Sequence, residues 1–142
     1  MGFNLLDDLS LKEKKDEIKI CKNKRFFDKI MYTKMRMANF NHKRQEFLKY
    51  FFNDLLKETF LVKRNREIIG ILSLKYDKNR VYLFDFAVNS CYRNQGFGTL
   101  ILNRLLLDLK KFGYAELCLY VFDTNKTAIQ LYDKVGFQRI EI

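Results

Sequence analysis

A short loop in the second half of the chain has the composition of a phosphate-binding loop. Its residues are Arg93, Asn94, Gln95, Gly96, Phe97, Gly98 and Thr99. A helix is expected to begin here, and the first amides of a helix lack partners while the helix dipole attracts anions. The glycines would let a pyrophosphate approach the backbone. A plain turn between a strand and a helix would give the same pattern, so the loop alone does not distinguish phosphate binding from a structural turn.

The loop does not match two widespread nucleotide-binding motifs. Asn94 stands where the dinucleotide-binding fingerprint has its first glycine, and the lysine of the Walker motif is missing. Nucleotide hydrolysis is therefore excluded as the expected chemistry.

Asp85 is a second candidate for chemistry, because it lies between Phe84 and Phe86 in an otherwise apolar segment. A carboxylate is costly to bury there unless it is solvated in a cleft or paired. It could accept a proton as a general base or hold a substrate ammonium group. A structural ion pair explains the residue equally well, and a water chain could replace a dedicated base.

The histidine and cysteine content argues against a metal site. His42 is the sole histidine and is expected on the surface, among polar and basic neighbours. Cys21, Cys91 and Cys118 are odd in number and widely spaced, which fits neither a disulfide framework nor a metal centre. Reduced thiols in the cytoplasm are the expected state, with Cys118 serving for packing.

Length and composition indicate one globular domain over residues 1–142, with residues 1–17 as a loose arm or helix. We expect neither a membrane span nor a signal peptide, since no apolar run is long enough and Asp7 and Asp8 replace a basic start. The net charge is +10, and more than half of the excess lies in residues 1–50. That charge attracts an anionic cofactor or substrate, or keeps the surface solvated.

The first half reads as helices followed by a meander of strands. A weak strand is predicted at Ile18–Cys21. Helical spacing follows from Arg25, with apolar positions Phe27, Ile30, Met31 and Met35, and again after Asn41 as helix cap, with Leu48, Phe51, Phe52 and Leu55. Three consecutive strands are then predicted at Thr59–Lys63, Glu67–Tyr76 and Val81–Val88.

The second half alternates helices and strands. The pattern predicts a helix at Thr99–Phe112 ended by Gly113, and a strand at Glu116–Phe122. A short helix capped at Thr124 or Asn125 and a last strand at Phe137–Ile142 complete the order. Apolar stripes are expected on the two helices at Leu102, Leu105, Leu106 and Leu109, and at Ala128, Leu131, Tyr132 and Val135. The fold class is therefore α+β.

Two motifs in residues 81–142 resemble those of the GNAT family of N-acetyltransferases. The first is Arg93-x-x-Gly96-x-Gly98 after an apolar strand, which matches that family's Gln/Arg-x-x-Gly-x-Gly/Ala cofactor motif. The second is Asn125-x-x-Ala128-x-x-Leu131-Tyr132, followed by Gly136-Phe137. The resemblance implies a mixed, mainly antiparallel sheet with flanking helices and a central splayed strand pair.

The resemblance also implies roles for individual residues. The backbone of Phe86, Ala87 and Val88 would bind the pantetheine arm of acetyl-CoA, and the loop from Arg93 to Thr99 would cradle the pyrophosphate. Asn125 would approach the cofactor arm, although an ordinary helix cap explains it as well. Tyr132 would be the general acid that protonates the departing sulfur, where the alternative is a core aromatic.

The resemblance implies an acetyl-CoA-dependent N-acetyltransferase acting on a primary amine of a small molecule or peptide by direct attack. A non-catalytic CoA-binding regulator is the alternative, because Tyr120 stands where many relatives have a glutamate. Nucleic-acid binding has no supporting motif. The family usually has another strand after the one predicted at Phe137–Ile142. Here that strand is either missing or supplied otherwise, for example by a partner chain in a homodimer.

Overall fold

The computed structural model describes residues 1–4, 18–23, 26–40, 46–55 and 58–140. His42 and Asn41, for which we predicted a surface position and a helix cap, lie outside these ranges. No helix within the described ranges is long and apolar enough to span a membrane.

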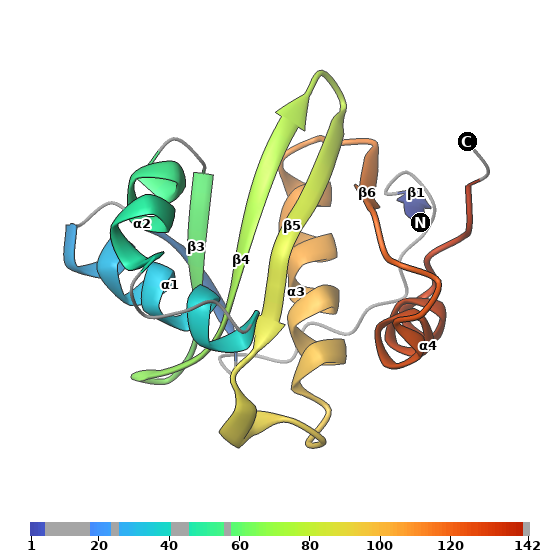
Figure 1. Ribbon diagram of the computed structural model, residues 1–142. Coiled ribbons are helices and arrows are strands. Elements are labelled where there is room, and N and C mark those ends of the chain that lie inside the picture. Colours follow the sequence, from blue (N-terminus) through green and yellow to red (C-terminus); the bar gives the residue numbers. More distant parts are fainter. Residues whose placement is uncertain (5–17, 24–25, 41–45, 56–57, 141–142) are drawn as a thin grey trace.

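A six-stranded sheet forms the centre of the molecule, in the order β1-β6-β5-β4-β3-β2 (Figure 1). The strands are β1 (Gly2–Asn4), β2 (Lys19–Lys22), β3 (Glu58–Arg64), β4 (Glu67–Asp77), β5 (Arg80–Val88) and β6 (Glu116–Leu119). All neighbouring pairs are antiparallel except β5 and β6, which are parallel. The predicted meander of three strands is therefore confirmed, and the weak strand at Ile18–Cys21 is shifted by one residue.

Helices cover both faces of the sheet (Figure 1). Helices α1 (Phe26–Asn39) and α2 (Phe47–Leu55) lie over β3 and its neighbours, whereas α3 (Phe97–Lys111) covers the opposite face. The fourth helix, α4 (Lys126–Val135), follows β6 and packs beside α3. The α+β class and the mixed sheet with flanking helices agree with the expectation.

The main core lies between the sheet and α3. The predicted apolar stripe of α3 is buried, and Leu102 and Leu106 are fully inaccessible to solvent. It packs against inward-facing strand residues such as Val81 and Leu117. Removing such surface from water contributes roughly 25 cal/mol for each Å², so this stripe anchors α3 and with it the loop that precedes the helix.

The apolar faces of the first two helices were predicted only in part. In α1, Met31 and Met35 pack against the smaller core, but Phe27 is 66% exposed and Tyr32 is the residue that is fully buried. In α2, Phe51 is buried, whereas Leu48 and Phe52 are exposed. Helical spacing alone does not distinguish a core face from an exposed apolar one, and these helices expose part of theirs.

The two ends of the chain correct the sequence prediction. Gly2–Asn4, expected in a loose arm, forms strand β1, which pairs with β6 on one side. On its other side, Gly2 forms a single bridge with Gln138. The predicted strand at Phe137–Ile142 is otherwise not formed within the described residues. Backbone of this chain's N-terminal segment thus occupies the sheet position between β6 and the segment after α4.

Candidate active site

A bulge in β5 is the first feature of the site. Ser73 of β4 pairs with Phe84, but Ile71 pairs with Ala87, so two residues of β5 lie opposite Leu72 alone. Asp85 is one of the two, and its φ of 52° lies in the left-handed region. A bulge of this kind bends the strand and redirects side chains. Aspartate tolerates the left-handed region better than most residues do, which is a local reason for its presence here.

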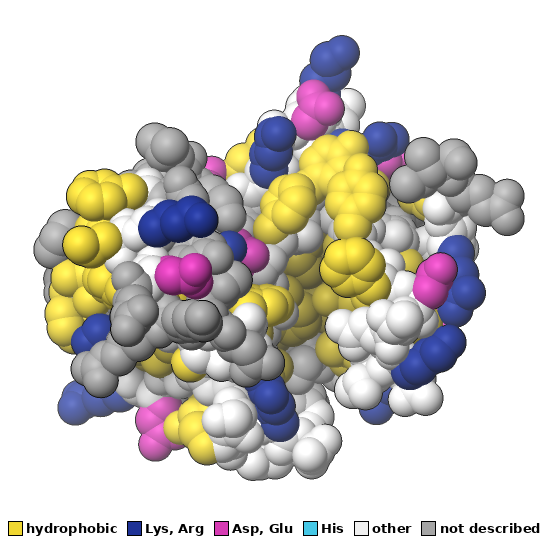
Figure 2. All heavy atoms as spheres, viewed as in Figure 1, with side chains coloured by type: hydrophobic (Ala, Val, Ile, Leu, Met, Phe, Trp, Pro, Cys, Tyr) yellow, Lys and Arg dark blue, Asp and Glu magenta, His cyan; other side chains and the backbone are white. Residues whose placement is uncertain are grey.

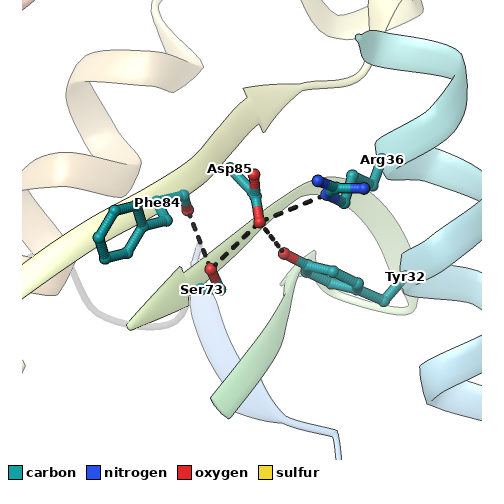
Figure 3. A network of polar contacts seen from close by, with 5 residues as sticks. All are labelled: Tyr32, Arg36, Ser73, Phe84 and Asp85. Carbon is teal, nitrogen blue, oxygen red and sulfur yellow. Dashed lines mark hydrogen bonds and ion pairs between the residues drawn. The ribbon is translucent and has the colours of Figure 1, made fainter. Parts of the chain in front are cut away.

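The carboxylate of Asp85 is held from three sides (Figure 3). Its Oδ2 lies 3.4 Å from Nε of Arg36, and it accepts hydrogen bonds of 3.4 Å from the hydroxyls of Tyr32 and Ser73. The side chains of Arg36 and Asp85 are only 14% and 17% exposed. The carboxylate thus joins β5 to α1. This contact is the structural ion pair that the sequence analysis offered as one explanation of Asp85. Neither Arg36 nor Tyr32 was singled out from the sequence, since contacts between distant segments leave no local signal.

Beyond the middle of β5, the two parallel strands separate. Their pairing runs from Arg80 and Glu116 to Leu83 and Leu119, where β6 ends, while β5 continues to Val88. Figure 1 shows β5 and β6 close together at one end and apart at the other. Phe86, Ala87 and Val88 therefore have no β6 partner, as the expected splayed pair requires. We call this opening the fork.

The backbone of β5 alternates in direction along the fork. The amide of Asn89 donates to the carbonyl of Ile69 in β4, so the polar groups of Val88, one residue earlier, point toward the fork. The Val88 carbonyl there accepts a 3.0 Å hydrogen bond from Nε of Arg93. By the same alternation the carbonyl of Phe86 also points into the fork, because Ala87 pairs with Ile71 of β4.

The loop after β5 presents the start of α3 to solvent. It passes through a 3-10 turn at Ser90–Tyr92 and reaches the helix at Gly96, whose φ is 81°. A Cβ atom added to Gly96 would meet nothing within 4 Å. Gly96 is exposed, and the helical amides that follow it and the helix dipole favour an anion there. The residues present therefore fit a pyrophosphate group at this position.

The remaining loop residues take different positions. Asn94 and Gln95 are exposed, and the Gln95 amide donates back to the Cys91 carbonyl. Phe97 is buried, and its ring meets Tyr92 edge to face at 6.0 Å. Thr99 is half-buried in the first turn of α3.

The side chain of Arg93 forms hydrogen bonds within the protein, unlike an arginine that is free to bind a phosphate. Besides its bond to Val88, its Nη2 donates a 2.6 Å hydrogen bond to Oδ1 of Asn39 at the end of α1. The guanidinium is thus anchored to two elements that flank the loop. Asn39 was not singled out from the sequence.

Helix α4 is held against the start of α3. A Cβ atom on Gly98 would lie 3.0 Å from Cδ2 of Leu131, so this glycine permits the close approach of the two helices. Asn125 caps α4, because its Oδ1 accepts a 3.2 Å hydrogen bond from the amide of Ala128. The cap predicted from the sequence is confirmed, and Gly136 ends the helix with a φ of 115°.

Tyr132 follows Leu131 in α4 and is 9% exposed. Its ring meets Phe137 edge to face at 5.5 Å. Burial raises the pKa of the Tyr132 phenol to about 12. The group is therefore protonated at neutral pH, which is the state that a proton donor needs.

An aromatic surface covers the face of the fork opposite α3, and we define it by Tyr82, Phe84 and Tyr120. The rings of Tyr82 and Tyr120 are stacked with centroids 6.3 Å apart, Tyr120 is 70% exposed and Phe84 is 39% exposed. Figure 2 shows hydrophobic side chains gathered over the β5–β6 part of this face. Tyr82 was not predicted as a site residue.

Comparison with known proteins agrees with this geometry. Residues 26–137 match the sequence profile described as the acetyltransferase (GNAT) family. The [ribosomal protein bS18]-alanine N-acetyltransferases of Haemophilus influenzae and Escherichia coli are 35% and 42% identical over 78 and 83 residues. These matches cover 55% and 58% of this chain, and 53% and 56% of the relatives. The chain thus matches little more than half the length of these two relatives.

Solved structures share the fold. The Escherichia coli ribosomal-protein-S18-alanine N-acetyltransferase superposes with a TM-score of 0.70 at 25% identity, covering 87% of this chain and 79% of the other. A GNAT acetyltransferase of Elizabethkingia anophelis with acetyl-CoA bound gives 0.64 at 24% identity, covering 89% and 80%. The profile match includes the bulge, the fork, the loop and α4. This chain therefore belongs to the acetyltransferase (GNAT) family.

Proposed function

We propose that the protein is an acetyl-CoA-dependent N-acetyltransferase acting in the cytoplasm, with the cofactor in the fork. The observation that carries the proposal is the end of β5–β6 pairing at Leu83 and Leu119, followed along the chain by the open start of α3 at Gly96. The backbone groups of Phe86 and Val88 that face the fork would hold the pantetheine arm, and the amides after Gly96 the pyrophosphate.

Bound acetyl-CoA supplies an activated thioester. The acceptor amine attacks its carbonyl carbon, the carbon–sulfur bond breaks, and the electron pair goes to sulfur. Tyr132 would give its phenolic proton to that sulfur and regain one from the attacking nitrogen through water. The phenol is protonated at neutral pH, as a proton donor must be.

We propose that Asp85 shapes the site and is not the base. Its Oδ2 is shared by Arg36, Tyr32 and Ser73, so a proton arriving there would disrupt an ion pair. Because Tyr120 occupies the place of the family's frequent glutamate, we propose that a water chain removes the amine proton.

The acceptor is proposed to be the N-terminus of a polypeptide that lies on the aromatic surface. The relatives named as alanine N-acetyltransferases of ribosomal protein bS18 support this class of acceptor. Tyr82, Phe84 and Tyr120 offer contact area for the first side chains beside the point where the amine must react.

An acceptor panel with detection of free thiol tests the proposal. Peptides with a free N-terminus should release thiol from acetyl-CoA, and the same peptides with a blocked N-terminus and an internal lysine should not. Release with the blocked peptides would identify a lysine acetyltransferase. Binding of acetyl-CoA without release for any amine would indicate the regulatory module.

A further inference from the structure

One face of α1 carries polar side chains that contact β5 and the following loop. Tyr32 and Arg36 reach Asp85 at the bulge, and Asn39, one turn further, reaches Arg93 in the phosphate loop. These positions recur at the spacing of one helix face. The same helix therefore touches the chain on either side of Phe86–Val88, where the pantetheine arm is proposed to bind.

Asn39 uses both ends of its amide in this contact. Its Oδ1 accepts the 2.6 Å hydrogen bond from Nη2 of Arg93. Its Nδ2 donates to Oδ1 of Asn89 at 3.1 Å and to the carbonyl of Met35 at 2.7 Å. Asn89 in turn donates to the carbonyl of Ile68 in β4 at 3.1 Å. An amide supplies one acceptor and two donors, so no other side chain of this size repeats the arrangement.

The consequence for Arg93 is that its guanidinium is already committed. Nε is bound to Val88 and Nη2 to Asn39, and hydrogen bonds from a charged donor are stronger than neutral ones. The loop before Gly96 is thereby tied to the end of β5 and to the end of α1. Arg93 acts on the loop as a brace between these elements.

We infer that Asn39 is a positioning residue for cofactor binding, holding Arg93 and thus the phosphate loop in the conformation that presents the first amides of α3. The inference rests on the proposed function, because the anion is taken to be the pyrophosphate of acetyl-CoA. Neither Asn39 nor α1 is required to touch the cofactor.

A double-mutant cycle measures the coupling. By calorimetry, Asn39→Ala should raise the Kd of acetyl-CoA by about 3- to 10-fold, the range expected for one hydrogen bond. If Asn39 acts through Arg93, the double variant Asn39→Ala/Arg93→Ala should bind no more weakly than Arg93→Ala alone. Turnover at saturating acetyl-CoA should stay within about 2-fold of wild type, because Asn39 is away from the reacting atoms. The inference would be overturned if the increases in Kd of the two single variants multiplied in the double variant, or if Asn39→Ala left the Kd unchanged.

Asn39→Asp covers the case in which the alanine variant does not fold. It keeps an acceptor for Arg93 but loses the donations to Asn89 and to the Met35 carbonyl, so its Kd should lie between those of wild type and Asn39→Ala. A loss as large as that of Arg93→Ala would overturn the inference. Asn103→Ala, a half-buried asparagine on α3, is the matched control and should bind as wild type does.

Amide hydrogen exchange of the cofactor-free protein separates this inference from the proposed function. Asn39→Ala should speed exchange by several-fold at the amides of Tyr92 and Arg93, which donate to the carbonyls of Asn89 and Ser90, whereas Asn103→Ala should not. If wild type binds no acetyl-CoA, the proposed function fails, but hydrogen exchange still tests whether Asn39 and Arg93 hold the loop. Equal exchange in Asn39→Ala and wild type would contradict it.

Discussion

The guanidinium of Arg36 and the carboxylate of Asp85 join helix α1 to the bulge of β5, with 3.4 Å between Nε and Oδ2. Both side chains are largely shielded from water, so each charge depends on the other. This pair holds β5 at the bulge, where its pairing with β4 shifts in register.

Removing one charge of this pair should destabilise the protein. Asp85→Asn removes one negative charge from beside the shielded guanidinium, and we expect a loss of about 2–3 kcal/mol in the free energy of unfolding, measured with urea. Asp85→Asn/Arg36→Met should lose less than Asp85→Asn alone. Glu116→Gln is the control, because the Arg80–Glu116 pair is 50% and 42% exposed and exposed ion pairs contribute little to stability. If Asp85→Asn is as mild as this control while turnover collapses, Asp85 is the general base after all.

Tyr132→Phe should slow the chemical step with little effect on the fold. The variant keeps the ring that meets Phe137 and loses only the proton donor, whose contribution is typically about 10²–10⁴-fold in rate. We expect turnover to fall by at least tens of fold, with the Kd of CoA and the Tm nearly unchanged. Tyr114→Phe removes a hydroxyl from a ring stacked on Tyr76 and should leave turnover unchanged. A stable Tyr132→Phe variant with near wild-type turnover would reduce this residue to a core aromatic.

The raised pKa of Tyr132 also predicts a dependence of stability on pH. Burial disfavours the phenolate, so the native pKa of about 12 lies above the unfolded value of about 10. The resulting stabilisation is complete below pH 10 and is lost as pH rises from 10 to 12, by at most about 2–3 kcal/mol. Denaturant unfolding at several pH values in this window should show a steeper decline for wild type than for Tyr132→Phe. Parallel declines would mean that the phenol ionises freely in the native state.

Much of the fold was predictable because its signals are local. The leucine stripe of α3, the Asn125 cap of α4 and the meander of β3, β4 and β5 depend on neighbouring residues in the sequence. The glycine loop and the α4 motif were recognisable for the same reason. Their spacing is fixed by a single turn and a single helix.

The features that could not be predicted from the sequence depend on contacts between distant segments. The pairing of Gly2–Asn4 with β6 joins opposite ends of the chain. The partners of Asp85 and Arg93 come from α1, whose apolar pattern favoured Phe27 over the buried Tyr32. A bulge that rotates Asp85 toward α1 interrupts the alternation of β5, and the sequence offers no separate signal for it.

Gly96 and Gly113 provide a matched test of the phosphate position. Both have positive φ values, 81° and 88°, and at both an added Cβ atom would meet nothing within 4 Å. Alanine at either position should therefore cost about 1 kcal/mol of stability through backbone strain. Only Gly96→Ala should weaken CoA binding, by at least about 10-fold, because Gly113 lies at the other end of α3. Equal affinities in calorimetry would place the pyrophosphate elsewhere.

Amide hydrogen exchange with and without acetyl-CoA tests the central claim most directly, since it locates the cofactor. The predicted result is slower exchange at Val88, whose amide faces the fork, and in the first turn of α3 after Gly96. A cavity of about 620 Å³ elsewhere, lined in part by Phe60, Leu109 and Phe112, should remain unchanged. Protection at that cavity, or no protection along the fork at millimolar acetyl-CoA, would contradict the account.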